Sequence, residues 1–418
     1  MLNAKKEREL AYVVKVDAIE PIEGKDRVEA AVIGGWKVMT RKGLFQPGDL
    51  GIYIEIDSKT PETAPFEFLS KYHYKVKTQK FKQFYSQGLL MHPSDFGWTV
   101  ESAQFAGGFL FVKDNEGNAH IPGEENMFLT KQLGITYAVA DDNKRKAPSV
   151  DKYKKMAQRN PELFKKNWAR WMMKREWGKK VMFFFFGKKK DKRGGWPSWV
   201  LKTDEERCQN MPWLFTDAQW HDTEWIATEK IDGSSTTFTI KRGKFGKYEF
   251  YVCSRNVCFD TPEKAEKCYY DSNIYIEMAD KYHIEEKMKV MLNQDPSLDF
   301  VTLQAETYGD GIQKRNYSMS NGQHALMVFN LIYGYKDGTK RRMNPCEMTN
   351  ILTPMGIPCV PVIAEIYRLP VDCDTLLLQA TGNSAIDGLP REGIVFRDRK
   401  GERSFKAVSN EFLAKYHG

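Results

Sequence analysis

Apolar and polar positions in the first sixty residues are arranged as a series of short β-strands. Apolar side chains gather in four short stretches, residues 10–16, 30–33, 36–40 and 50–56. Turn-forming residues at 24–26 and 46–49 separate these stretches, as is typical of strands joined by tight connections. Regular short strands of this kind predict a small β-barrel or sandwich.

The pattern changes in the middle of the chain. Residues 152–180 have the spacing of a helical stretch, and from Trp196 onward the pattern is mixed, with strands that carry polar motifs. A helix is predicted to begin at an Asp271 N-cap and to run to about Leu292. We therefore expect an α+β protein in three parts: an N-terminal module at 1–140, a basic, tryptophan-rich linker or helical segment at 141–195, and a larger domain at 196–418.

Composition places the chain among ordinary globular proteins. It has 418 residues, of which 41% are hydrophobic and 28% charged, and this length predicts two or three domains. Its seven cysteines form no CxxC pair and its seven histidines no HxxxH pair, which argues against zinc and disulfide frameworks. With no signal-peptide pattern and no apolar run long enough to cross a bilayer, we expect a cytoplasmic protein without a membrane partner.

Positive charge is concentrated in one segment. Between Lys165 and Arg193 twelve Lys and Arg face only Glu176 and Asp191, a net charge of +10, whereas the whole chain carries +8. Tryptophans lie among these bases, at positions 168, 171 and 177. A dense basic patch with aromatic residues is typical of a polyanion-binding surface such as one for RNA. The alternative is a solvated helix whose tryptophans pack against a neighbouring domain.

A second basic stretch lies in the N-terminal module. Lys77, Lys80 and Lys82 alternate with aromatic residues at positions 81, 84 and 85. Cations that meet phosphate beside rings that stack on bases would suit a nucleic-acid surface. A solvated β-hairpin explains the same pattern equally well.

The candidate chemistry centres on Lys230-Ile231-Asp232-Gly233. This stretch follows an apolar run and precedes an alternating one, which places Lys230 at a strand end. A lysine there, next to a glycine that lets a ligand approach the backbone, can act as a covalent nucleophile. So short a pattern also arises by chance, and the other reading is a solvated lysine.

Further stretches of suitable chemistry follow in order. They are Ser254-Arg255-Asn256, Glu306-Thr307-Tyr308-Gly309, Phe329-Asn330-Leu331, Glu392-Gly393-Ile394-Val395 and Phe405-Lys406. Together with the Lys230 stretch, they resemble motifs I, Ia, III, IIIa, IV and V of the covalent nucleotidyltransferases. That superfamily comprises ATP-dependent DNA and RNA ligases and GTP-dependent mRNA capping enzymes.

Two upstream stretches narrow the resemblance. Residues 202–210, and residues 22–27 together with 34–38, look like those of nick-sealing RNA ligases that carry an N-terminal OB-fold module. In DNA ligases and capping enzymes an OB domain follows motif V, whereas here only twelve residues follow Lys406. The resemblance therefore implies an OB-like β-barrel followed by a ligase-type nucleotidyltransferase domain with antiparallel sheets and flanking helices.

The implied activity is ATP-dependent sealing of RNA 3′-OH and 5′-phosphate ends, at nicks in a duplex, by a monomer that uses Mg²⁺ or Mn²⁺. Lys230 would form lysyl-AMP, the AMP would pass to the 5′-phosphate, and the 3′-OH would then displace it. Alternatives are a GTP-dependent capping guanylyltransferase, a DNA nick ligase and a non-catalytic RNA-binding protein. A covalent label from ATP or from GTP separates the first of these from a ligase.

The resemblance also implies roles for individual residues. Lys230, Asp232 and Lys406 are the expected catalytic residues, with Lys406 on the α-phosphate and Asp232 and Gly233 shaping the loop. The expected nucleotide contacts are Glu229 with the adenine amino group, Phe329 with the adenine face and Arg255 with the ribose or the 5′-phosphate. Glu306 and Glu392 would hold a ribose hydroxyl or metal-bound water, and Arg207, Lys77, Lys80 and Lys82 would contact RNA.

One position departs from the pattern. Motif V usually reads Lys-x-Lys, but Val408 stands at the second lysine. A free lysine has a pKa near 10.4, so the Lys230 amine needs nearby cations to become nucleophilic at neutral pH. Either Lys406 is the one protein cation that acts on the Lys230 amine, or another base such as Lys400 or Arg403 assists.

Overall fold

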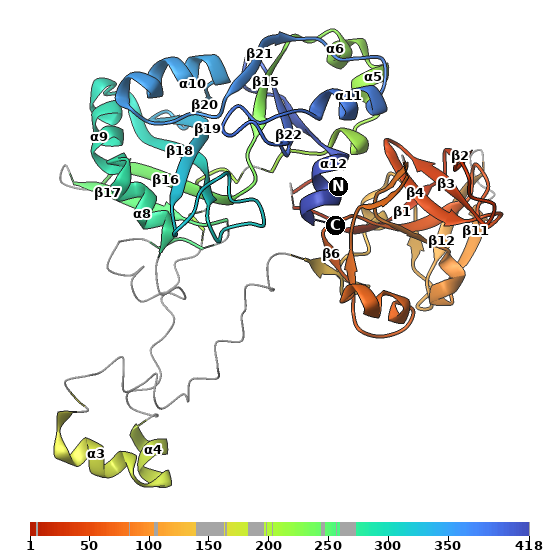
Figure 1. The fold of residues 1–418 in the computed structure, drawn as a ribbon, viewed down its shortest axis with the longest axis horizontal. Helices are drawn as coiled ribbons and strands as arrows, with labels where there is room; N and C mark the ends of the chain where they lie inside the picture. Colours follow the sequence, from red (N-terminus) through yellow and green to blue (C-terminus); the bar gives the residue numbers. More distant parts are fainter. Residues whose placement is uncertain are drawn as a thin grey trace.

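The computed structural model (Figure 1) describes residues 1–5, 7–82, 84–103, 108–138, 163, 165–182, 196–197, 199–202, 204–243, 247–255, 257–259 and 273–417. The residues form an N-terminal β-rich domain, a larger two-sheet domain and a short helical unit between them in sequence. No helix among these residues is long and apolar enough to cross a membrane.

The N-terminal domain is built on strand β5 (Leu50–Ile54), all five residues of which are buried. It pairs antiparallel with β1 (Ala11–Lys15) on one side and β10 (Leu89–Met91) on the other. The remaining elements are β2 (Ala18–Pro21), β3 (Val28–Ile33), β4 (Trp36–Arg41), β6 (Ser58–Lys59), η1 (Glu67–Tyr72), β7 (Lys75–Val76), β8 (Gln79–Phe81), β9 (Phe84–Ser86), η2 (Pro93–Phe96), β11 (Thr99–Ala103), β12 (Phe109–Lys113), β13 (Ala119–His120), η3 (Glu125–Met127) and β14 (Thr136–Tyr137). Apolar side chains along these short strands enclose one continuous core.

The larger domain contains two antiparallel sheets. One has the strand order β17-β16-β18-β19-β20, and the other has the order β21-β15-β22-β23. The strands are β15 (Trp225–Lys230), β16 (Ser234–Arg242), β17 (Tyr248–Cys253), β18 (Leu298–Gly309), β19 (His324–Tyr335), β20 (Lys340–Arg342), β21 (Val362–Tyr367), β22 (Gly393–Asp398) and β23 (Ser404–Val408). The chain crosses from the second sheet to the first between β15 and β16, and this crossing is the Lys230-Ile231-Asp232-Gly233 stretch.

Helices cover both sheets. They are η6 (Cys208–Asn210), α5 (Trp213–Thr216), α6 (Ala218–His221), α8 (Ile274–Lys281), α9 (Ile284–Gln294), α10 (Pro345–Leu352), η8 (Thr353–Met355), α11 (Cys373–Ala380), α12 (Asn410–Phe412) and the π-helical turn η9 (Leu413–His417). Apolar residues of α8, α9 and α10 share a core with the five-stranded sheet, and α11 packs with the four-stranded sheet.

The single helix predicted up to Leu292 is wrong. The chain instead forms α8 and α9, because His283 adopts a left-handed conformation with φ of 50° between them. The N-cap is Asn273, whose side chain accepts hydrogen bonds from the backbone N–H groups of Tyr275 and Ile276; the predicted cap Asp271 lies outside the described residues.

The basic segment is also divided. Its described part forms α3 (Asn167–Met173) and α4 (Glu176–Met182). Ala169 and Met182 are buried against each other with three further apolar residues of the unit, Leu163, Met172 and Met173. The two short helices therefore have a small core of their own.

Candidate active site

Lys230 ends β15 opposite Gly393 of β22, and Gly233 is the last residue before β16 of the other sheet. A Cβ atom on Gly233 would lie 2.3 Å from the backbone oxygen of Thr307, closer than non-bonded atoms can approach. Only glycine therefore lets the loop lie against β18. This close packing fixes the predicted nucleophile beside the C-terminal end of β18, the middle strand of the five-stranded sheet.

Three carboxylates converge on Lys230. Its Nζ lies 2.7 Å from Oε2 of Glu392, the residue just before β22. Glu306 of β18 pairs with Ser235 in the ladder, and the charges of Glu306 and Asp232 also act on the Lys230 amine. The fold thus brings into one site the side chains that the motifs predicted to act together. Lys230 and Glu392 are 162 positions apart in the sequence.

Burial and this acidic surrounding set the protonation states. Burial acts to lower the pKa of Lys230, but Glu392, Glu306 and Asp232 outweigh it and raise that pKa above its usual value. Burial raises the pKa of Glu306 to about 8, with Glu392 and Asp232 adding to the effect. Burial likewise raises the pKa of Glu392 against the opposing charge of Lys230. Without ligands, the site therefore holds a protonated lysine beside carboxyl groups, of which Glu306 is largely protonated at neutral pH.

Lys406 of β23 lies in a second cluster of charges. Its Nζ donates to Oδ1 of Asp204 at 3.0 Å, and the other oxygen of Asp204 accepts from Arg8 at 2.9 Å and from Arg255 at 3.3 Å. Burial lowers the pKa of Lys406 to about 8; Asp204 opposes this, and the positive charges of Arg8, Arg207 and Lys230 add to it. Lys406 and Lys230 are therefore close enough for the charge of Lys230 to lower the pKa of Lys406.

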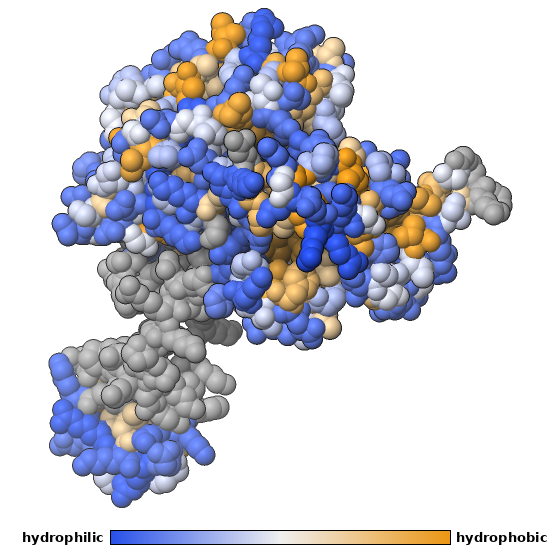
Figure 2. Space-filling model, turned by 45° about the vertical axis from the view of Figure 1, so that its right-hand side comes forward, coloured by the Kyte–Doolittle hydropathy of each residue, from blue (hydrophilic) through white to orange (hydrophobic). Residues whose placement is uncertain are grey.

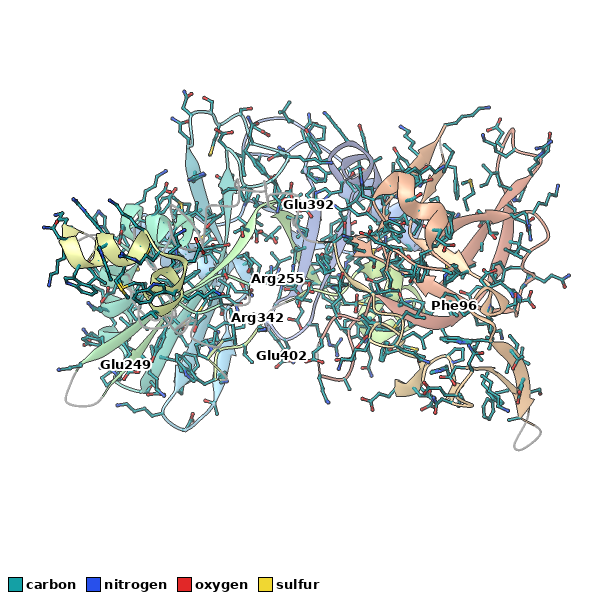
Figure 3. The ribbon with its side chains drawn as sticks, turned by 90° about the horizontal axis from the view of Figure 1, so that it is seen from below. Phe96, Glu249, Arg255, Arg342, Glu392 and Glu402 are labelled. Atoms are coloured by element: carbon teal, nitrogen blue, oxygen red, sulfur yellow. The ribbon has the colours of Figure 1, made fainter. Side chains whose placement is uncertain are left out.

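Arg255 is half-exposed, and its guanidinium lies 5.2 Å from the ring centroid of Tyr137 in the N-terminal domain. It extends from the segment after β17 toward Asp204, so it faces the boundary between the two domains. Figure 3 shows Arg255 and Glu392 in the middle of the molecule, between the five-stranded sheet and the N-terminal strands.

Arg207 does not lie with the other predicted RNA contacts. It is buried, its Nη2 donates to Asp57 of the N-terminal domain at 3.2 Å, and its backbone forms a bridge with Lys406. Lys80, by contrast, lies on the β8–β9 hairpin over the ring of Tyr85, with Lys77 and Lys82 on either side in sequence. The predicted RNA-contact residues thus fall into two separate places.

Arg207 and Arg8 add positive charge beside Lys406, and neither is among the bases that the sequence suggested in place of a second motif V lysine. Arg403 instead donates to the backbone oxygen of Gln219 and lies over the ring of Trp220, and Lys400 is exposed in the turn before β23. Val408 replaces the expected second lysine, and two arginines from outside β23 supply positive charge near Lys406 instead.

Glu229 and Phe329 occupy the two sheets. Glu229 is buried, with one carboxylate oxygen accepting from the backbone N–H of Ala385 at 2.8 Å and the other without a protein partner. Phe329 lies at a bulge in β19, between residues that pair with Ala305 and Gln304. Its ring is partly buried and faces the guanidinium of Arg397 in the other sheet, 5.9 Å from the ring centroid.

Sequence reasoning missed the residues that hold the Lys230 loop. The hydroxyl of Tyr317 accepts from the backbone N–H of Asp232 at 2.7 Å, and Gln313 donates to the backbone oxygen of Gly233 at 2.8 Å. His417 approaches the Asp232 carboxylate at 3.5 Å. Tyr317 and Gln313 belong to the polar connection between β18 and β19, where no periodic pattern marks a function.

The acidic cluster fits a hydrated divalent cation. Within the part of the chain that the structure describes, no three Asp, Glu, His or Cys side chains come close enough to hold one ion directly. Mg²⁺, however, usually keeps several waters and is held by one or two carboxylates. Glu306 and Glu392 have this chemistry, and Asp232 adds a buried oxygen without a hydrogen-bond partner.

A strand-end lysine among carboxylates, a second lysine nearby and two antiparallel sheets define a nucleotidyltransferase-type domain, here joined to a small N-terminal β-domain. Residues 223–417 match the family model described as RNA ligase. Residues 10–93 match an OB-fold domain. The predicted α+β class, with an N-terminal OB module, is thereby confirmed.

Solved structures agree with this fold. A mutant of Naegleria gruberi RNA ligase with ATP and Mn has a TM-score of 0.65 at 22% identity, covering 98% of this chain and 100% of that chain. The Naegleria gruberi enzyme with PPi has a TM-score of 0.65 at 22% identity, with 98% and 99% covered. Another mutant with AMP and Mn has a TM-score of 0.64 at 22% identity, again with 98% and 99% covered. No curated protein sequence matches.

Proposed function

We propose that this RNA ligase seals RNA 3′-OH and 5′-phosphate ends with ATP, through AMP carried on Lys230. The observation that carries the proposal is the position of Lys230 at the end of β15, 2.7 Å from Glu392, with Glu306, Asp232 and the charge of Lys406 beside it. Carboxylates that can hold a divalent cation, and a second lysine that can neutralise phosphate charge, are what a lysine nucleophile at a phosphate needs.

In the first transfer the Lys230 amine loses a proton, and its lone pair attacks the α-phosphorus of ATP. A P–N bond forms, the bond to the bridging oxygen breaks, and pyrophosphate leaves. The Lys230 loop, held by Tyr317 and Gln313, keeps the amine in one place for in-line attack. Lys406 supplies positive charge for the α-phosphate oxygens, for which it must leave Asp204 or share it.

A divalent cation held by Glu306 and Glu392 would supply charge that lowers the pKa of Lys230 and neutralises the phosphate. Related Naegleria gruberi structures contain ATP and Mn, which supports ATP with Mg²⁺ or Mn²⁺ as the reactants here. Glu229, with a buried unpartnered oxygen, is suited to accept from the adenine amino group. Phe329 offers a ring face to the base.

The two later transfers use the same site. An oxygen of the RNA 5′-phosphate attacks the AMP phosphorus, and the P–N bond breaks as Lys230 takes up a proton. The RNA 3′-OH then loses its proton and attacks the activated 5′-phosphate, and AMP leaves. Arg255, at the boundary with the OB-fold domain, is placed to hold a nucleotide or strand phosphate.

We further propose that the substrate is a nick in a duplex and that the protein acts as a monomer in the cytoplasm. Sealing assays on two nicked duplexes, with either ribose or deoxyribose at the 3′-OH end, test the substrate. Sealing of the ribose nick supports the proposal, while sealing of the deoxyribose nick alone would make the protein a DNA ligase.

Labelling with ATP or GTP tests the reaction class. A covalent label from ATP is expected, and a label from GTP alone would indicate a capping guanylyltransferase. No label from either nucleotide, with RNA binding unchanged in Lys230→Ala, would indicate a non-catalytic RNA-binding protein.

A further inference from the structure

The α3–α4 unit presents aromatic rings on its surface. Trp168, Trp171 and Trp177 are 49%, 49% and 54% exposed, although tryptophan is normally among the most extensively buried residues. The small core of the unit is made by Ala169 and Met182 with neighbouring apolar residues, so the rings are not needed to fill it. This arrangement argues against the reading in which the tryptophans pack inward.

The rings are surrounded by positive charge. Residues 165–182 contain seven Lys and Arg against Glu176 alone, a net charge of +6. The guanidinium of Arg175 lies 3.7 Å from the ring centroid of Trp171, and Trp171 and Trp177 meet edge to face at 6.1 Å. In Figure 2 the described residues of this unit, at the lower end of the view, are mostly hydrophilic.

Exposed rings within a basic surface have the two properties that single-stranded nucleic acid requires. Cations neutralise the backbone phosphates, and flat rings stack on unpaired bases, each such contact contributing about 1–3 kcal/mol. Bases inside a duplex are already stacked on each other and offer the rings no free face. Single-stranded RNA therefore fits this surface better than duplex RNA.

We propose that the surface of Trp168, Trp171 and Trp177, with the Lys and Arg of α3 and α4, binds single-stranded RNA and so holds an unpaired strand for the ligase domain. The choice of RNA rests on the proposed function, because a ligase of RNA ends must hold RNA. The unit is then a second RNA contact, separate from the site around Lys230.

Binding of the full-length protein to a fluorescent single-stranded RNA tests the proposal. The triple variant Trp168→Ala/Trp171→Ala/Trp177→Ala should bind at least about tenfold more weakly, while affinity for the same sequence in a duplex changes little. The Phe triple variant, which keeps a stacking ring at each position, should bind much more tightly than the Ala variant. Trp213→Ala, at a 42% exposed tryptophan on α5, is the matched control and should bind as the wild type does.

Charge is tested separately. Lys174→Ala/Arg175→Ala/Lys180→Ala should reduce the slope of log affinity against log salt by about 2, since each phosphate contact to a single strand contributes about 0.7. Replacement of Lys15, Lys131 and Lys336, three exposed lysines elsewhere, should leave the slope unchanged.

Three results would overturn the proposal. They are wild-type RNA affinity in the Ala triple variant, equal losses in the Ala and Phe variants, and tryptophan-dependent binding to phosphatidylserine/phosphatidylcholine vesicles with unchanged RNA binding. Formation of the ATP adduct in the absence of RNA is measured in every variant. If the wild type forms no adduct, the proposed function is wrong. A variant that loses RNA affinity but forms a normal adduct tests only the proposed role of the tryptophan surface.

Discussion

Val408 of the ligase domain packs against Ile56 of the OB-fold domain. Both side chains are buried, and Leu413 at the start of η9 completes this small apolar cluster. Val408 lies two positions after Lys406, on the strand that the expected second lysine of motif V would occupy. The departure at this position therefore has a structural reason, because the strand here forms an interface between domains.

Replacing Val408 should destabilise that interface. Val408→Ala removes buried methyl groups and should lower the free energy of unfolding by about 2 kcal/mol. Val408→Lys places a charge in an apolar contact and should cost several kcal/mol without increasing activity. Urea unfolding measures both, with the same substitutions at Val371, which is 79% exposed, as controls. Faster adduct formation in Val408→Lys would contradict this reading.

Tyr317→Phe should loosen the Lys230 loop. The variant keeps the ring but leaves the buried N–H of Asp232 without its acceptor, a loss of about 1–3 kcal/mol. We expect slower adduct formation with little change in the apparent affinity for ATP, because the bond positions the loop. Single-turnover kinetics measure both quantities. The control is Tyr333→Phe, at a residue of β19 that pairs with Val301. Equal rates of adduct formation in the wild type and in Tyr317→Phe would show that Tyr317 does not position the loop.

Asp204 should set the upper pH limit at which Lys406 is charged. Burial lowers the pKa of Lys406 to about 8, and Asp204 opposes that effect. Asp204→Asn removes the opposing charge, so the pKa falls further, by about one unit or more. Because a lysine is charged only below its pKa, the variant should lose activity at lower pH than the wild type does.

The rate of adduct formation between pH 6 and 9 (about the range over which Lys406 titrates) measures this shift. Asp222→Asn changes an exposed carboxylate and should leave the profile in place. A profile of Asp204→Asn that overlays the wild type would show that Lys406 does not limit the alkaline side.

Divalent metal should change the reactivity of the Lys230 amine directly. Without metal, burial favours a low pKa, but the neighbouring carboxylates hold the pKa of Lys230 above its usual value. Its reaction with acetic anhydride should therefore rise only at strongly alkaline pH when metal is chelated. Mg²⁺ should move that rise to lower pH, and Glu392→Gln should do so in the chelated protein.

Mass spectrometry of peptides measures the extent of labelling at each lysine. Lys400, exposed in a turn, serves as the internal control, since metal should not alter its labelling. A Lys230 profile that responds to neither Mg²⁺ nor Glu392→Gln would contradict the electrostatic account of this site.

The features of this protein that the sequence predicted are those that depend on short, local stretches of residues. The motifs at Lys230, Glu306 and Glu392 lie at or near strand ends, and pairing of β15 with β22 and of β16 with β18 brings them together. Their residue types and order were therefore enough to indicate a common site. The short N-terminal strands could be predicted for the same reason, since turns and apolar stretches are local features of the sequence.

The parts that could not be predicted depend on contacts between distant segments. The burial of Arg207 against Asp57 and of Val408 against Ile56 follows from how two domains dock, which no local pattern encodes. The break at His283 rests on a left-handed residue that apolar spacing does not reveal. Tyr317 acts through its hydroxyl on a backbone N–H 85 positions away, in a connection that has no regular pattern.

Mapping the covalent adduct tests the central claim most directly. The full-length protein is incubated with ATP and Mg²⁺, digested, and searched by mass spectrometry for a peptide that has gained one AMP. We predict AMP on Lys230, no adduct in Lys230→Arg, and a normal adduct in Lys241→Arg, a lysine on β16 paired with Asp299. AMP on a different residue, or an undiminished adduct in Lys230→Arg, would contradict the account.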